Sequence, residues 1–281
     1  MATSIFPKLW TDRPLGGAQI NRGHPLARDL SLLILFQEGT FTRDLVYGEP
    51  ATIVSVDSGS PGMIQEKKGP QQRFGHTSSW PFIGFQNASR IIPPNNVTIS
   101  CGMIPINTNT VGSLFGLKGQ DNPNRIQAHA PYSDGVLYWD FGDSGGTGRV
   151  TASGLFTAGV PAFISLTSGD TPAGKAIYYN GIQKASNGNS PAISVTATEF
   201  QVGGWNYSDT NANRQETGCW FFSVHRRVLL PGEALEYAMN PYAILVSQAP
   251  MRRYWVQGAA AAAGADGGGP RTFAAFVPGF P

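Results

Sequence analysis

Apolar and polar residues alternate with a period of two in many short segments of this chain, which is the pattern of β-strands. Residues 30–36 are almost entirely apolar and predict a first strand that is buried. Residues 97–104 alternate cleanly, and the alternation places four apolar side chains on one face: Val97, Ile99, Cys101 and Met103. These two segments predict strands that enter a hydrophobic core.

Similar segments recur along the chain at short intervals. We predict further strands at residues 51–56, 80–85, 89–92, 113–117, 125–129, 135–141, 148–152, 162–167, 200–203 and 219–225, with 80–85 and 89–92 forming a hairpin across Gln86 and Asn87. Residues 176–185 predict another hairpin, because Asn180-Gly181 suits a two-residue turn in which both central residues have positive φ. About a dozen short strands at this spacing indicate a sandwich or barrel.

One short helix is predicted near the end of the domain. Pro231 stands at a first helical position, Glu233 lies in the first turn, and Asn240-Pro241 ends the segment. Ala234, Leu235, Tyr237 and Ala238 give it an apolar side. The two ends of the chain lack such periodicity.

The pattern divides the 281 residues into three parts. Residues 1–27 are predicted to be an extended N-terminal arm, residues 28–247 the β domain, and residues 248–281 a Gly/Ala/Pro-rich extension with no core of its own. The 35 Gly and 21 Pro agree with many turns and few long helices. We expect both ends to dock on other chains, and therefore a homo-oligomer or multi-copy assembly.

Composition excludes several classes of partner. A net charge of +2 with scattered Lys and Arg gives no basic field for nucleic acid. The sequence has no apolar run long enough to span a membrane and no secretion signal at its start. Cys101 and Cys219 are expected to be separate buried thiols, with a bridge between two sheets as the alternative.

Several segments, in their order along the chain, resemble the laminin-G-like, concanavalin-A-like jelly-roll domains found in bacterial and tailed-phage proteins. They are 27–39, with its aromatic-x-Glu-Gly end, Arg43-Asp44-Leu45, 51–53, 97–100, the Tyr-x-Asn-Gly hairpin at 175–181, 200–204 and the ending at 224–241. The resemblance covers about residues 26–247. Residues 21–28, Asn-Arg-Gly-His-Pro-Leu-Ala-Arg, are similar to a start that phage relatives carry.

The resemblance implies an all-β fold, a two-sheet antiparallel jelly-roll sandwich. Together with the helix and the two ends predicted above, we expect this sandwich to carry one short C-terminal helix and extended terminal arms. The resemblance also implies carbohydrate or protein binding. The function we expect is a non-enzymatic structural protein of a tailed-phage virion, a capsid decoration or head/tail accessory protein. Its partners would be other virion proteins, such as a major capsid or tail protein, and its location the virion after synthesis in the host cytoplasm. A host-glycan-binding module is the alternative, and a glycoside hydrolase of this fold the second alternative.

One motif suggests catalysis but is expected to serve structure. Residues 142–146, Gly-Asp-Ser-Gly-Gly, spell the surroundings of a serine-protease nucleophile, yet no histidine has the matching context, so a hairpin loop is predicted. A glycoside hydrolase usually needs two carboxylates flanking the bond, and no strand carries such a pattern. We therefore expect no enzyme activity.

The candidate sites lie in predicted loops and in the two ends. Exposed aromatic rings can stack on sugars while Asp and Asn fix the hydroxyls, which selects these candidates for glycan binding: Tyr132, Asp134, Trp205, Asn206, Tyr207 and Asp209. Cations and aromatics dominate protein interfaces, which selects Trp10, Arg22, His24, Arg252, Arg253, Tyr254 and Trp255 as interface candidates. No cofactor is expected; calcium on the loops at 121–124 and 209–211 is the alternative.

Overall fold

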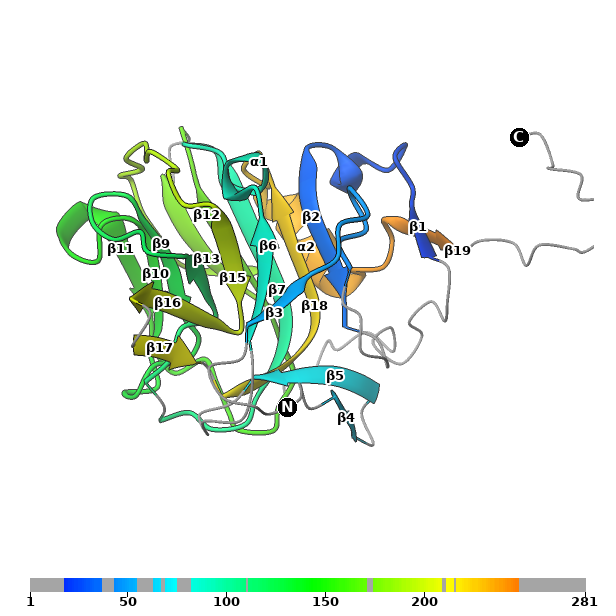
Figure 1. The fold of residues 1–281 in the computed structure, drawn as a ribbon, viewed down its shortest axis with the longest axis horizontal. Helices are drawn as coiled ribbons and strands as arrows, with labels where there is room; N and C mark the ends of the chain where they lie inside the picture. The colour runs from blue at the N-terminus through cyan, green and yellow to red at the C-terminus, as the bar shows by residue number, and fades with distance from the viewer. Residues whose placement is uncertain are drawn as a thin grey trace, which may run out of the picture.

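The computed structural model describes residues 18–36, 43–54, 63–66, 69–74, 82–109, 111–170, 174–208, 211–214 and 216–247. These residues form two large antiparallel sheets packed face to face, as Figure 1 shows. The predicted fold class, an all-β jelly-roll sandwich with few helices, is confirmed.

The first sheet has eight strands. Seven follow one another in the order β14 (Ile182–Asn187), β13 (Lys175–Tyr179), β12 (Ala162–Ser168), β7 (Val97–Pro105), β18 (Thr217–His225), β5 (Gly69–Phe74) and β4 (Met63–Glu66). The eighth, β2 (Leu30–Leu35), also pairs with β18. The long strands β7 and β18 lie side by side at the centre.

The second sheet has seven strands. Their order is β11 (Arg149–Ala152), β10 (Leu137–Gly142), β9 (Arg125–His129), β8 (Phe115–Leu117), β15 (Glu199–Val202), β6 (Phe82–Gln86) and β3 (Thr52–Val54). After β15 the chain turns at Gly203, whose φ of 88° favours glycine, into a separate hairpin of β16 (Gly204–Ser208) and β17 (Asn211–Arg214). β16 packs beside β8.

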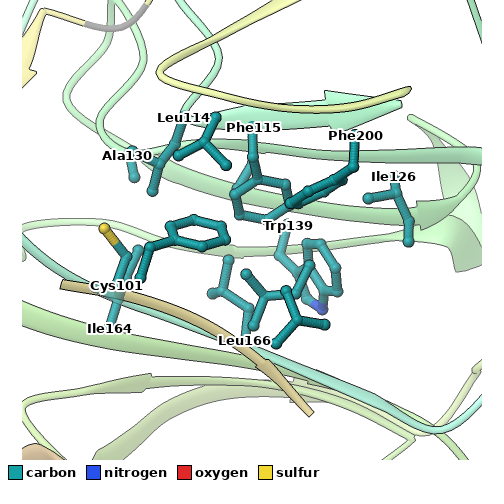
Figure 2. Packing of buried hydrophobic residues seen from close by; sticks show 14 of the residues in the cluster. Cys101, Leu114, Phe115, Ile126, Ala130, Trp139, Ile164, Leu166 and Phe200 are labelled. Atoms are coloured by element: carbon teal, nitrogen blue, oxygen red, sulfur yellow. The ribbon is translucent and has the colours of Figure 1, made fainter. Parts of the chain in front are cut away.

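Alternate residues of both sheets point into one shared core. Figure 2 shows rings of the seven-stranded sheet, Phe115, Trp139 and Phe200, opposite Ile164 and Leu166 of the other sheet. The indole of Trp139 donates a hydrogen bond of 2.8 Å to the carbonyl of Thr167 and so links the two sheets. The face predicted for residues 97–104 is confirmed, because all four of its apolar side chains are in this core.

A second core covers the other face of the eight-stranded sheet. Its cover consists of α2 (Pro231–Met239), a 3-10 turn at Pro25–Ala27, and the strand pair β1 (Ala18–Ile20) and β19 (Leu245–Ser247). Phe163 and Phe221 of the sheet contact Tyr237 of α2 at ring distances of 5.6 and 5.5 Å. The predicted helix is confirmed, although Leu235 on its expected apolar side is 42% exposed.

This third layer differs from the extended arm expected for residues 1–27. In the described part of that arm, Leu26 and Ala27 are buried and β1 pairs with the end of the domain. The apolar residues of this segment are too few to show a period, so the sequence pattern did not predict that the segment packs on the domain. Residues 1–17 and 248–281 lie outside the described part of the chain.

Two local predictions were wrong. Residues 89–92 do not form a strand after Asn87, because Ala88–Ile91 is a single helical turn, α1, and β6 pairs with β3 and β15 instead. The segment that starts at Trp205 is not a loop but strand β16. Short segments with few apolar residues are compatible with either strand or helix until their neighbours are known.

Cys101 and Cys219 lie on the paired strands β7 and β18 of one sheet, not across two sheets. Both are free, buried thiols whose sulfur atoms are 3.5 Å apart, and burial raises the pKa of Cys101 well above its usual value. Among the described helices, none has the length and apolar character needed to cross a membrane.

Candidate functional site

The outer face of the seven-stranded sheet carries polar residues where its inner face carries the core. On β10, Leu137, Trp139 and Phe141 point inward, so Tyr138 and Asp140 point outward. The pairing register sets Tyr138 opposite His129 on β9 and Asp140 opposite Arg149 on β11. Adjacent strands thus bring rings and charges together on one surface.

A compact group of side chains forms at the β9–β10 end of this face. We call His129, Tyr132, Asp134, Tyr138 and Arg149 the tyrosine cluster. Tyr132 and Tyr138 are half-buried, with ring centroids 5.7 Å apart and nearly perpendicular planes. Tyr132 also contacts the ring of His129 at 4.6 Å, so both tyrosines are fixed by aromatic packing while part of each stays accessible.

The turn between β9 and β10 positions Asp134. Tyr132 N–H donates to the carbonyl of Val136, and Gly135, with φ 77°, closes the turn. The Tyr138 hydroxyl donates to Asp134 Oδ2 at 2.5 Å, and Val136 N–H donates to Oδ1 at 3.0 Å. The bond from Tyr138 holds the pKa of Asp134 below its usual value and raises the pKa of Tyr138. Asp134 is therefore an exposed, ionised carboxylate.

Arg149 covers one side of Tyr138. Its guanidinium carbon lies 4.7 Å from the centre of the Tyr138 ring, a cation–π distance. Nε and Nη2 donate to the two oxygens of Asp140 at 2.6 and 2.7 Å, and Asp140 is fully buried. This bidentate pairing keeps the guanidinium in one plane over the ring.

His129 packs against the two tyrosines from the buried side of the cluster. Its Nδ1 donates to the carbonyl of Gly112 at 2.5 Å, and the residue is buried. Burial lowers the pKa of His129, so the ring is neutral at neutral pH. Its role in the cluster is to pack against the tyrosines rather than to add charge.

The arrangement can hold a polyhydroxylated ligand. Aromatic surface that remains accessible can cover the apolar C–H face of a sugar, and a carboxylate with free lone pairs accepts bonds from hydroxyls. Tyr132 supplies the first and Asp134 the second, and the two are neighbours in one turn.

The structure separates the predicted glycan candidates into two groups. Tyr132 and Asp134 lie together in the cluster. Trp205, Asn206 and Tyr207 belong to β16, where the backbone alone is described, and Asp209 lies outside the described residues. Proximity between the two groups stays a prediction.

Sequence reasoning missed three members of the cluster. Tyr138, His129 and Arg149 were assigned only to strands, yet the strict alternation of residues 137–141 already places Tyr138 on the polar face. The cross-strand register that brings His129 and Arg149 beside it has no signal in a single sequence.

The described interface candidates contact their own domain. Arg22 donates to the carbonyl of Val46 at 3.0 Å. His24 accepts a bond from Leu26 N–H and lies 3.8 Å from Glu236 of α2. The other interface candidates, Trp10, Arg252, Arg253, Tyr254 and Trp255, lie outside the described residues.

Residues 143–148 connect β10 to β11, and they include most of the segment 142–146 that was predicted to be a hairpin loop. Ser144 is held by Asn122, whose Nδ2 donates to the hydroxyl at 2.9 Å. Beneath the loop, the buried Lys175 donates to the carbonyls of Phe141 and Gly148, both at 2.9 Å. The calcium alternative rested on Asp121 and on Asp209; within the described residues, Asp121 pairs with Arg125 at 2.9 Å, and no three His, Cys, Asp or Glu gather as a metal site.

No protein-family model matches the chain, and no curated protein matches its sequence. Its likeness to known proteins is structural. Domain 4 of the arabinanase AbnA from Geobacillus stearothermophilus, solved in complex with arabinotriose, aligns with a TM-score of 0.57 at 17% identity, over 75% of this chain and 98% of that one.

Two other kinds of protein share the fold. Trypanosoma rangeli sialidase, in complex with sialic acid, aligns with a TM-score of 0.52 at 14% identity, over 77% of this chain and 33% of the sialidase. The binding domain of botulinum neurotoxin DC, in complex with SialylT, aligns with a TM-score of 0.53 at 11% identity, over 75% of this chain and 50% of that one. At such identities the likeness shows the fold alone: this chain has the β-sandwich found in these three proteins.

Proposed function

We propose that this chain is a carbohydrate-binding domain and that the tyrosine cluster is its sugar site. The observation that carries the proposal is the pairing of two half-buried tyrosines with an exposed, ionised Asp134 on one sheet face. All three structural neighbours described above were solved with a sugar or a sugar-bearing ligand, which supports the same class of ligand.

Rigidity favours binding at this surface. Tyr138 is held by Asp134 on its hydroxyl and by Arg149 on its face, and Tyr132 packs against Tyr138 and His129. Because these rings are already ordered, a ligand loses little affinity to the ordering of side chains.

The proposal is binding without catalysis. Most glycoside hydrolases need two carboxylates on either side of the scissile bond. Asp140 is fully buried and paired with Arg149, which leaves Asp134 as the exposed carboxylate within the cluster. This arrangement supports the expectation that the domain is not an enzyme.

A role in a tailed-phage virion stays a prediction from the family resemblance. None of the structural neighbours named above is a virion protein, and the described residues 18–27 pack on their own domain rather than project from it. Glycan binding is compatible with a place on a virion that meets the host surface, and it has the stronger support.

Replacing Tyr132 tests the site. Calorimetric titration of the full chain with arabinotriose and a panel of neutral and sialylated oligosaccharides identifies a ligand. Tyr132→Ala is expected to weaken its binding at least about tenfold, because a central aromatic contact contributes on the order of 2 kcal/mol.

Tyr47 provides a matched control. It is 46% exposed, and the guanidinium of Arg90 lies 4.0 Å over its ring, an arrangement like that of Tyr138 and Arg149 but outside the cluster. Tyr47→Ala should leave the affinity unchanged while both variants keep the thermal transition of the parent. Equal affinities for parent and Tyr132→Ala would refute the site, and absence of binding across the panel would refute the function.

A further inference from the structure

The charges around the tyrosine cluster differ in exposure. The carboxylate of Asp134 is exposed, whereas Arg149, the cation of the cluster, is half-buried. A ligand that lies on Tyr132 therefore meets negative charge first.

The guanidinium of Arg149 is committed to the protein. It donates two bonds to Asp140, and Asp140 has no exposed surface. If Arg149 turned toward a ligand, the buried carboxylate would lose both of these hydrogen bonds and keep Arg125 Nη1 at 4.0 Å, which is unfavourable. Arg149 therefore stays over Tyr138 rather than serving as a partner for an anionic ligand.

A second guanidinium, that of Arg125, also has carboxylate partners, of which Asp121 is the nearer. Arg125 has its Nε 2.9 Å from Asp121 and its Nη1 4.0 Å from Asp140. Within the cluster the charge of Arg149 is offset by the buried Asp140, so the exposed Asp134 leaves this part of the surface negative.

We infer that the tyrosine cluster selects neutral oligosaccharides and discriminates against sugars that carry a carboxylate. This inference rests on the proposed function and names its ligand class. The hydroxyls of a neutral sugar can donate to Asp134, whereas a sugar carboxylate beside Asp134 would meet a like charge with no cation released to balance it.

Matched ligands test this preference for neutral over acidic sugars, which we call the charge rule. The full chain is titrated with galactotriose and with trigalacturonic acid, which have the same number of sugar residues and differ in the carboxyl groups at C6. We expect the acidic member to bind about tenfold more weakly or worse, with a difference that narrows as salt is raised because exposed charges are screened.

Asp134→Asn links the discrimination to one residue. The amide keeps an acceptor for the Tyr138 hydroxyl but removes the charge, so the ratio between the acidic and neutral affinities should approach one. Glu236→Gln is the control, since it removes the same charge from a 57% exposed side chain on α2, across the eight-stranded sheet from the core. It should leave the ratio as it is in the parent.

The outcomes are distinguishable. Acidic sugars that bind the parent as tightly as neutral ones overturn the charge rule and leave the proposed function standing. A ratio that Asp134→Asn does not change also overturns it. Failure of every sugar to bind the parent removes the proposed function and this inference together.

Discussion

At the scale of single residues, two buried cationic or titratable side chains, His225 and Lys175, donate to backbone carbonyls. His225, which is fully buried, donates from Nε2 to the carbonyl of Leu26 at 2.7 Å. Lys175 donates to two carbonyls, and burial lowers its pKa to about 8. Each of these side chains forms hydrogen bonds to segments that are distant in sequence, and these bonds stabilise the packing of those segments.

His225 should make the protein sensitive to mild acid. Burial lowers its folded-state pKa from 6.5 to about 4, so between these values the unfolded chain binds more protons. The free energy of unfolding should therefore fall as pH drops from 6.5 to 4, by up to roughly 3 kcal/mol from this residue. Urea unfolding followed by tryptophan fluorescence at several pH values measures the slope.

His225→Gln isolates this contribution from other groups that titrate in the same range, such as His129, whose pKa is also lowered. The glutamine can still donate to Leu26 but cannot be protonated, so the variant should lose stability less steeply between pH 6.5 and 4. The same slope in the parent and the variant would contradict the assignment of this pKa to His225.

At the scale of elements, the strands that the sequence predicted best are those with strict alternation beside a turn of defined chemistry. Residues 125–129 match β9, and the hairpin at Asn180-Gly181 forms with φ of 52° and 79°. The strand predicted at residues 89–92 was wrong, because a segment of four residues fits one helical turn as well as a strand. Tyr132 and Asp134 were found because the β9–β10 turn is local, whereas Arg149 reaches Tyr138 only through strand register.

The Asn180-Gly181 turn also meets the third layer. A Cβ on Gly181 would lie 2.7 Å from the Cα of Leu235 in α2, in a left-handed conformation that alanine disfavours. Gly181→Ala should therefore lower the free energy of unfolding by roughly 2–4 kcal/mol. Thermal and urea unfolding measure the loss.

Gly188→Ala is the matched control, since a Cβ there meets nothing within 4 Å and the position is exposed. It should change stability by about 0.5 kcal/mol or less. Equal effects of the two substitutions would mean that the close approach of α2 to this turn does not exist in solution.

At the scale of the whole molecule, the eight-stranded sheet is the middle one of three layers. The sandwich core lies on one side of it, and the layer of α2, Pro25–Ala27, β1 and β19 lies on the other. The tyrosine cluster lies on the outer face of the opposite sheet, so the proposed sugar site and the layer that contains β1 and β19 are on different sides of the sandwich (Figure 1). Sugar binding should therefore tolerate changes in the terminal layer that keep the domain folded.

Leu26 tests whether that layer is part of one cooperative unit. The side chain is fully buried in the second core, and its carbonyl accepts the bond from His225. Leu26→Ala should lower the free energy of unfolding by about 2–5 kcal/mol, the usual cost of such a cavity, and shift the transitions seen by fluorescence and circular dichroism together. Val246→Ala, at a position 45% exposed, should have little effect. A sandwich transition that stays in place in Leu26→Ala would show instead that residues 18–27 are a separable arm, as the sequence pattern predicted.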